Sequence, residues 1–161
     1  MNTEMQIIRE VNAQAEAFYA VAEHLGQHAA YALKTQHRSQ LTGLENIAES
    51  AFKTTDILDY IKKQTARYSF WRQGYPRSEN PDEGYGESLK TYLEREMPRK
   101  RDQICSRLKI GDKSDEEKQQ RRHIYLLLMR QFIRQMVIEY EYSVSQNTVN
   151  RPNTGNRRRE A

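Results

Sequence analysis

The spacing of apolar residues over the first 32 positions is the feature that most constrains the fold. After Thr3 and Gln6, a capping-box pair typical of a helix start, apolar side chains recur at intervals of three and four. They are Ile8, Val11, Ala15, Phe18, Ala22, Leu25, Ala29 and Ala32. This rhythm predicts a long helix whose apolar side packs on other helices. Because alanine returns every seventh residue from Ala15, we expect a neighbouring helix to approach closely.

A second helix is predicted from Thr42, which pairs with Glu45 as another capping box, to about Arg72. The apolar rhythm continues through this range, so we interpret it as one unbroken helix. Gly74 is typical of a helix end. The Gly and Pro residues of 74–87 then predict a surface loop.

Two further helical segments follow the loop. The stretch "ESLKTYLEREM" predicts a short helix, and Pro98 starts or kinks the next segment, which ends at Gly111. Ser114 with Glu117 forms the best helix N-cap in the sequence. The helix that starts there should reach about Ser145, and its middle, "HIYLLLMRQFIRQMVIEY", is apolar on most sides. We therefore expect it to be the central helix.

These elements predict an all-α fold, a helical bundle of four to five helices over residues 1–145. A chain of 161 residues is long enough to bury one sizeable core. Residues 146–161 have almost nothing to bury and carry Arg157, Arg158 and Arg159, so we expect a disordered basic tail. No stretch alternates apolar and polar residues long enough to predict a strand.

The chain has one cysteine, Cys105, which excludes an intrachain disulfide and a cysteine-based zinc site. Its start, "MNTEMQIIRE", lacks the basic and apolar regions of a signal peptide. The longest apolar run, "IYLLLM", is far too short to cross a membrane. We expect a cytoplasmic protein without membrane contact.

No residue pattern indicates an enzyme. His24 and His28 lie four apart on one helix face, but no third ligand accompanies them, so we predict no metal site and no cofactor. One type of helical RNase places an arginine five residues before a histidine, and no histidine here has one. Phosphate-binding loops and nucleophile elbows are absent from the sequence. We predict no catalytic residues.

The net charge of +4 is modest, and the distribution of the charges is more informative. Residues 62–77 hold five bases and no acid, and two further basic patches occupy 99–109 and 121–134. Arg130 and Arg134 interrupt an apolar stretch, so each needs a carboxylate such as Glu139 or an external phosphate. The residues that we predict to contact nucleic acid are Lys62, Lys63, Arg67, Arg72, Arg77, Arg99, Lys100, Arg101, Arg121, Arg122, Arg130 and Arg134.

The segment "ARYSFWRQGYPR" interleaves these cations with aromatic rings. Single-stranded nucleic acid is held by such a pairing, because cations meet phosphates and rings stack on bases. Alternatively, Tyr68 continues the apolar seam and Trp71 or Phe70 fills the core. Both interpretations hold together if some rings turn inward while the arginines stay in water.

A helix-turn-helix is the second interpretation of "ENIAESAFKTTDILDYIKK", because its apolar residues match that motif. The turn of the motif should offer a glycine and then an apolar residue, where this chain has Phe52 and Lys53. An unbroken helix explains the same pattern. A DNA-binding regulator therefore stays an alternative.

The chain resembles the small subunit of a Cascade-type CRISPR effector complex. The resemblance lies in "LTGLENIAESAFKTTDILDYIKKQTAR" and "RRHIYLLLMRQFIRQMVIEYEYS", about a third of the chain. It is a likeness of helical texture and positive charge, without catalytic motifs.

The resemblance implies a non-catalytic subunit of a ribonucleoprotein complex in antiviral defence. Such a subunit contacts neighbouring subunits, including further copies of itself, and stabilises the guide–target duplex or the displaced single-stranded DNA through backbone contacts. Its partners would be guide RNA, target DNA and the other proteins of the complex. A rival from another class is a helical adaptor or assembly factor whose basic faces meet acidic protein surfaces.

Overall fold

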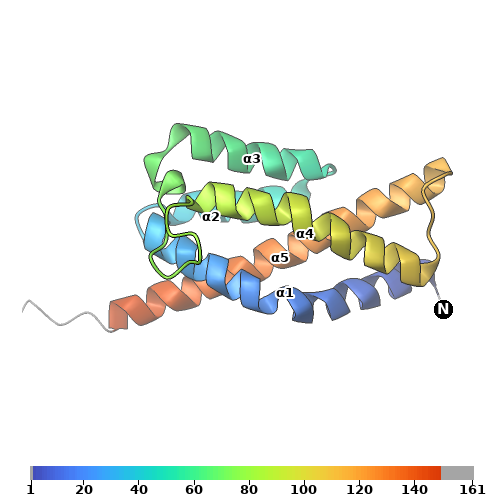
Figure 1. The fold of residues 1–161 in the computed structure, drawn as a ribbon, viewed down its shortest axis with the longest axis horizontal. Helices are drawn as coiled ribbons and strands as arrows, with labels where there is room; N and C mark the ends of the chain where they lie inside the picture. Colours follow the sequence, from blue (N-terminus) through green and yellow to red (C-terminus); the bar gives the residue numbers. More distant parts are fainter. Residues whose placement is uncertain (1, 150–161) are drawn as a thin grey trace, which may run out of the picture.

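The computed structural model describes residues 2–149, with side chains up to residue 147, and all regular structure in this range is helical (Figure 1). This confirms the predicted all-α bundle. The helices are α1 (Thr3–Leu33), α2 (Arg38–Ser50), α3 (Thr54–Arg67), the short 3-10 helix η1 (Ser69–Arg72), α4 (Tyr85–Leu108) and α5 (Asp115–Val149). Because α5 continues to Val149, the bundle extends past the predicted boundary at residue 145. Arg157, Arg158 and Arg159 lie outside the described residues.

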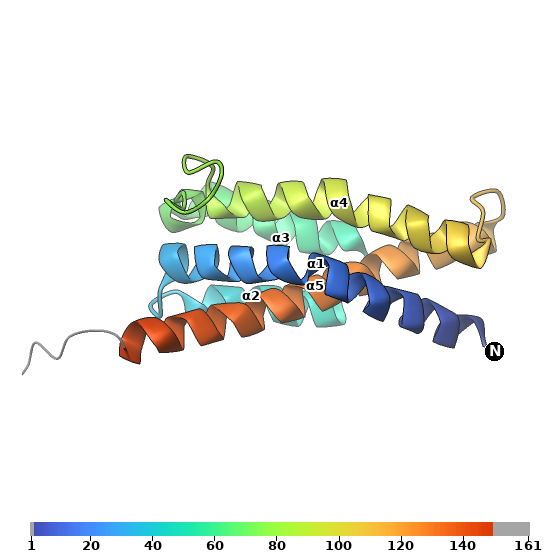
Figure 2. The same cartoon turned by 60° about the horizontal axis from the view of Figure 1, so that its bottom comes forward.

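The five α-helices alternate in direction, so the chain enters at one end of the bundle and α5 finishes at the other (Figures 1 and 2). Helix α5 packs against α1, α2, α3 and α4, as expected for a central helix. Its side chains Met129, Phe132, Ile133, Met136 and Tyr140 are fully buried. The apolar character of α5 on most sides follows from having neighbours on most sides.

Helices α1 and α5 approach each other closely at Gly26. A Cβ atom at this position would lie 2.6 Å from the Cβ of Glu139 and 2.8 Å from the carbonyl oxygen of Met136. Ala22 and Ala29, one turn to either side, are completely buried. The predicted close approach along the alanine seam is therefore present, with the glycine at its centre.

The start of α1 differs from the prediction in two ways. Asn2 caps the helix, because its side-chain oxygen accepts a hydrogen bond from the backbone nitrogen of Glu4 at 3.0 Å. Ile7 rather than Ile8 is buried, with Ile8 46% exposed. Ile7, Val11 and Phe18 are separated by four and seven residues, a spacing that keeps all three on the α5 side.

Replacing Gly26 with alanine tests the α1–α5 contact. In an exposed helix this change stabilises by about 1 kcal/mol through helix propensity. Here the new methyl group meets backbone atoms, and we expect a loss of about 1–3 kcal/mol in the free energy of unfolding. Urea denaturation followed by circular dichroism measures it, and a gain in stability would contradict the close approach.

The helix predicted over 42–72 was wrong as one element. It is broken at Ala51–Lys53 into α2 and α3, it begins at Arg38 rather than Thr42, and η1 follows α3. The break lets α3 fold back on α2, where the hydroxyl of Tyr60 donates to the carbonyl oxygen of Gln40 at 2.7 Å. Gly43 makes room for that hydroxyl, since a Cβ there would lie 2.6 Å from it.

Helix α4 joins two segments that were predicted separately, with Pro98 inside it. It ends at Lys109, whose left-handed conformation turns the chain so that Ile110 donates to the carbonyl of Cys105 at 2.8 Å. Cys105 is buried, and this burial raises the pKa of its thiol.

The predicted cap of the last helix is confirmed. The backbone nitrogen of Glu117 donates to the hydroxyl of Ser114 at 3.1 Å, and the Glu117 carboxylate accepts from the backbone nitrogen of Ser114 at 3.3 Å. The same carboxylate accepts a hydrogen bond from the backbone of Gly111. These bonds, that of Gly111 first, lower the pKa of Glu117.

The cap makes stability depend on pH. Because folding lowers the pKa of Glu117, its contribution is fully present above the unfolded value of about 4.3 and is lost as the pH falls through the folded value. We expect Glu117→Gln to unfold at a lower temperature than the wild type at pH 7, with the difference shrinking below about pH 4.3. Thermal melts over this pH range measure it, and a constant difference would argue against the cap.

Candidate nucleic-acid interface

The twelve predicted contact residues do not form one surface. Lys62, Lys63, Arg67, Arg72 and Arg77 lie at the end of the bundle where α3 finishes and the 73–84 loop begins (Figure 1). Arg99, Lys100, Arg101, Arg121 and Arg122 lie toward the opposite end, on the second half of α4 and the first half of α5. Arg130 and Arg134 lie between the two groups, against α2.

The α4–α5 group is largely neutralised inside the protein. The Asp102 carboxylate forms ion pairs with Arg121 at 2.6 Å and with Arg101 at 3.1 Å. Arg99 forms an ion pair with Glu96 at 3.2 Å. The Arg101 guanidinium also lies 5.5 Å from the centre of the Tyr125 ring. Two cations of this group, Lys100 and Arg122, have no carboxylate partner in the described part of the chain.

Arg130 and Arg134 hold α2 against α5. Arg130 donates from two nitrogens to the carbonyl oxygens of Ala48 and Ala51, each at 2.7 Å, and thereby caps the C-terminus of α2. Arg134 donates twice to one carboxylate oxygen of Glu49, at 2.6 and 3.2 Å. Glu139, the suggested partner, instead accepts from the side-chain amide of Gln135. Sequence reasoning missed these acceptors because Arg130 lies about 80 residues from them.

Arg130→Met should therefore affect stability. We expect a loss of about 2–3 kcal/mol, because two carbonyl oxygens at a half-buried helix end lose a charged donor. The matched variant Arg134→Met removes an exposed ion pair and should cost about 0–1 kcal/mol. Urea denaturation of both variants at pH 7 compares them, and equal losses would overturn the capping role of Arg130.

The end of α3 carries the unneutralised positive charge. Lys62, Lys63 and Arg67 are exposed and form no ion pair within residues 2–147. We call these three residues the α3 cluster. Arg72 lies beside them but donates to the carbonyl oxygens of Thr65 and Ala66, at 2.8 and 3.1 Å, which caps α3. Its guanidinium therefore has a structural use in addition to its charge.

The aromatic residues of this end divide between core and surface. Trp71 is fully buried and donates from its ring nitrogen to the side-chain oxygen of Gln40 at 2.7 Å. Outside it, the rings of His37 and Phe70 are parallel within 6° at 3.6 Å, and Tyr68 stacks on Phe70 at 5.3 Å and 24°. We call His37, Phe70 and Tyr68 the ring stack. Tyr68 is 37% exposed, so the stack reaches the surface directly after Arg67.

The 73–84 loop is fixed to the bundle at its first residue. The carbonyl oxygen of Gln73 accepts from the backbone of Tyr85 at 3.0 Å and from the Nε2 of His28 at 2.8 Å. His28 is buried, and this burial lowers its pKa and favours the neutral ring. Gly74 permits close contact across the loop, since a Cβ there would lie 1.9 Å from the carbonyl oxygen of Pro81. Arg77 therefore extends from an anchored loop.

No protein-family model, curated protein or solved structure matches this chain. Within residues 2–149, no group of three His, Cys, Asp or Glu side chains is placed to hold a metal ion. None of the helices in that range has both the length and the apolar character needed to cross a membrane.

Sequence reasoning also missed His37 in the ring stack, and a groove lined by Tyr31 and Tyr142. Residue type alone did not separate these rings from core positions. Their only signal was a polar neighbourhood, which many surface residues share.

Proposed function

We propose that the chain is a non-catalytic helical subunit of a Cascade-type CRISPR ribonucleoprotein complex. In this role it contacts the sugar–phosphate backbone of nucleic acid and stabilises the guide–target duplex or the displaced single-stranded DNA within the complex. The observation that supports nucleic-acid binding most directly is the α3 cluster, which has no acidic partner among the described side chains and adjoins the ring stack. Assignment to a CRISPR complex depends on the family resemblance described above.

The α3 cluster and the ring stack match the two parts of a single strand, its phosphates and its bases. Lys62, Lys63 and Arg67 lie on about one and a half turns of helix, so their charges can follow a run of phosphates. Tyr68 offers a ring face to a base, and stacking of this kind is worth about 1–3 kcal/mol per base. The positive charge is undiminished by internal pairing, in contrast to the α4–α5 group.

Reversing the α3 cluster tests the proposal. The variant Lys62→Glu, Lys63→Glu, Arg67→Glu should reduce the affinity for a 20-nucleotide single strand on the order of 100-fold at 0.1 M salt. The slope of log affinity against log salt should fall in magnitude by about 2, because each lost phosphate contact contributes roughly 0.7 for single strands. Fluorescence anisotropy over a salt series measures both.

The matched control is Arg9→Glu, Lys113→Glu, Lys118→Glu, which changes the net charge equally at the opposite end. It should bind nearly as the wild type does. Because glutamates at the C-terminus of α3 also oppose the helix dipole, the glutamine triple variant, checked by circular dichroism, separates binding from folding. Equal losses for the α3 and control variants would refute this location.

The other function classes give different results in the same assay. A protein adaptor would show no affinity for the single strand even at low salt. A helix-turn-helix regulator would prefer one duplex sequence over random duplex and single strand. The break at Ala51–Lys53 places a turn where that motif needs one, but Phe52 is 95% exposed there rather than packed between the helices.

A further inference from the structure

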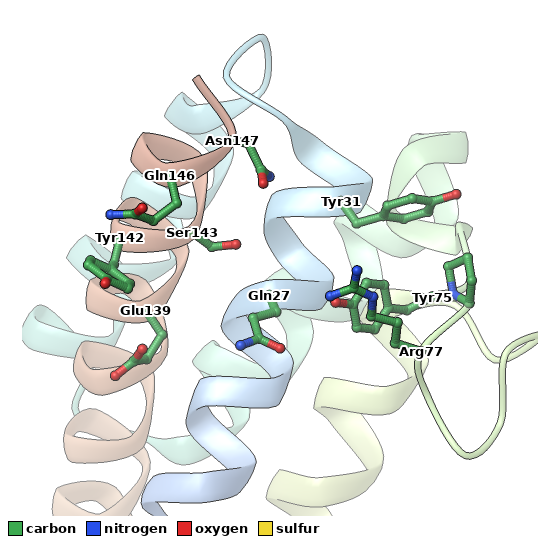
Figure 3. A pocket seen from close by; sticks show the side chains of 10 residues that line it. Gln27, Tyr31, Tyr75, Arg77, Glu139, Tyr142, Ser143, Gln146 and Asn147 are labelled. Carbon is green, nitrogen blue, oxygen red and sulfur yellow. The ribbon is translucent and has the colours of Figure 1, made fainter. Parts of the chain in front are cut away.

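A groove lies between the end of α1, the 73–84 loop and the end of α5, at the same end of the bundle as the α3 cluster (Figures 1 and 3). Its volume is about 400 Å³, within the range of small-molecule sites. Three tyrosines line it, one from each element: Tyr31, Tyr75 and Tyr142. We call it the tyrosine groove.

The rings differ in exposure. Tyr75 is buried and stacked on His28 at 5.4 Å and 21°, so its position is fixed by the core. Tyr31 lies 5.5 Å from Tyr75 at an angle of 56°, and 42% of it is exposed. Tyr142, on the α5 wall of the groove, is 64% exposed (Figure 3). Figure 3 shows Tyr31 beside Tyr75 on the loop side of the groove, so the open ring of Tyr31 next to the buried Tyr75 suits a flat ring as ligand.

The polar groups suit the edge of a nucleobase. Gln27, Gln146 and Asn147 supply amides that can both donate and accept. Glu139 also lines the groove and is only 8% exposed. It is held by the side-chain amide of Gln135 at 3.0 Å and by the hydroxyl of Tyr19. Its carboxylate therefore faces Gln135 and Tyr19 rather than the tyrosines of the groove, and the amides are the groups left for the edge of a base.

Arg77 completes the groove with a positive charge. It is exposed, extends from the anchored loop, and forms no ion pair with the described side chains. In Figure 3 its guanidinium lies at the groove beside Tyr31 and Tyr75. An arginine at the rim of an aromatic site can bind the phosphate that carries the stacked base.

We propose that the tyrosine groove holds one unpaired nucleobase of the bound strand. This inference rests on the proposed single-strand binding and adds the site that takes a base. The α3 cluster would hold the backbone, and Arg77 would hold the phosphate next to the groove. Taking one base from its stack costs least in a strand that is already single.

The test compares a 20-nucleotide deoxycytidine oligomer with an abasic oligomer of the same length by fluorescence anisotropy. The wild type should prefer the base-bearing oligomer. Tyr31→Ala, Tyr142→Ala should weaken binding to deoxycytidine by about tenfold or more and leave the abasic oligomer unchanged. Phe52→Ala, an exposed ring at the far end of α2, is the matched control and should change neither affinity.

The outcomes separate the two proposals. If the wild type binds neither oligomer at low salt, both the proposed function and the groove fall. If it binds both oligomers and the tyrosine double variant binds deoxycytidine as tightly as the wild type does, the groove alone is refuted. Circular dichroism confirms that the exposed substitutions leave the bundle folded.

Discussion

The contact between α1 and α5 at Gly26 is the constraint on which the rest of the bundle depends. Two long helices can approach this closely only if one of them carries very small side chains at the crossing. In α1 these positions are Ala22, Gly26 and Ala29. With α1 in place, Phe18 meets Phe132 edge to face at 5.4 Å in the core. The hydroxyl of Tyr140 on α5 donates to the carbonyl of Lys34, where α1 turns toward α2. The same crossing brings Gln27 and Glu139 into one groove.

Arginine has two uses in this molecule, and the sequence does not distinguish them. Arg72 and Arg130 each cap the C-terminus of a helix, α3 and α2 respectively, by donating to backbone carbonyl oxygens. A phosphate presents similar acceptors, so an arginine beside an apolar run is equally compatible with either partner. Lysine has no planar fork for two carbonyls. The exposed Lys62 and Lys63 were therefore the better sequence signal for an external anion.

The long helices could be predicted from the sequence because the spacing of their apolar residues is set within each helix. The cap at Ser114 and Glu117 could be predicted for the same reason, since its partners are three residues apart. The break after Ser50 could not, because it depends on Arg130 from another helix and on Tyr60 folding back onto Gln40. The buried Trp71 likewise donates its ring hydrogen bond to the side chain of Gln40, which is 31 residues away in the sequence. The groove combines residues from separate elements, so no short motif marks it.

The odd number of α-helices gives the molecule two unlike ends. Because the chain reverses direction four times between the five α-helices, residue 2 and the end of α5 lie at opposite ends of the bundle (Figure 2). Helix α1 spans 31 residues, or roughly 46 Å. A fluorophore or fused protein joined to the N-terminus would therefore remain well away from the α3 cluster and the tyrosine groove, whereas one joined to α5 would crowd them.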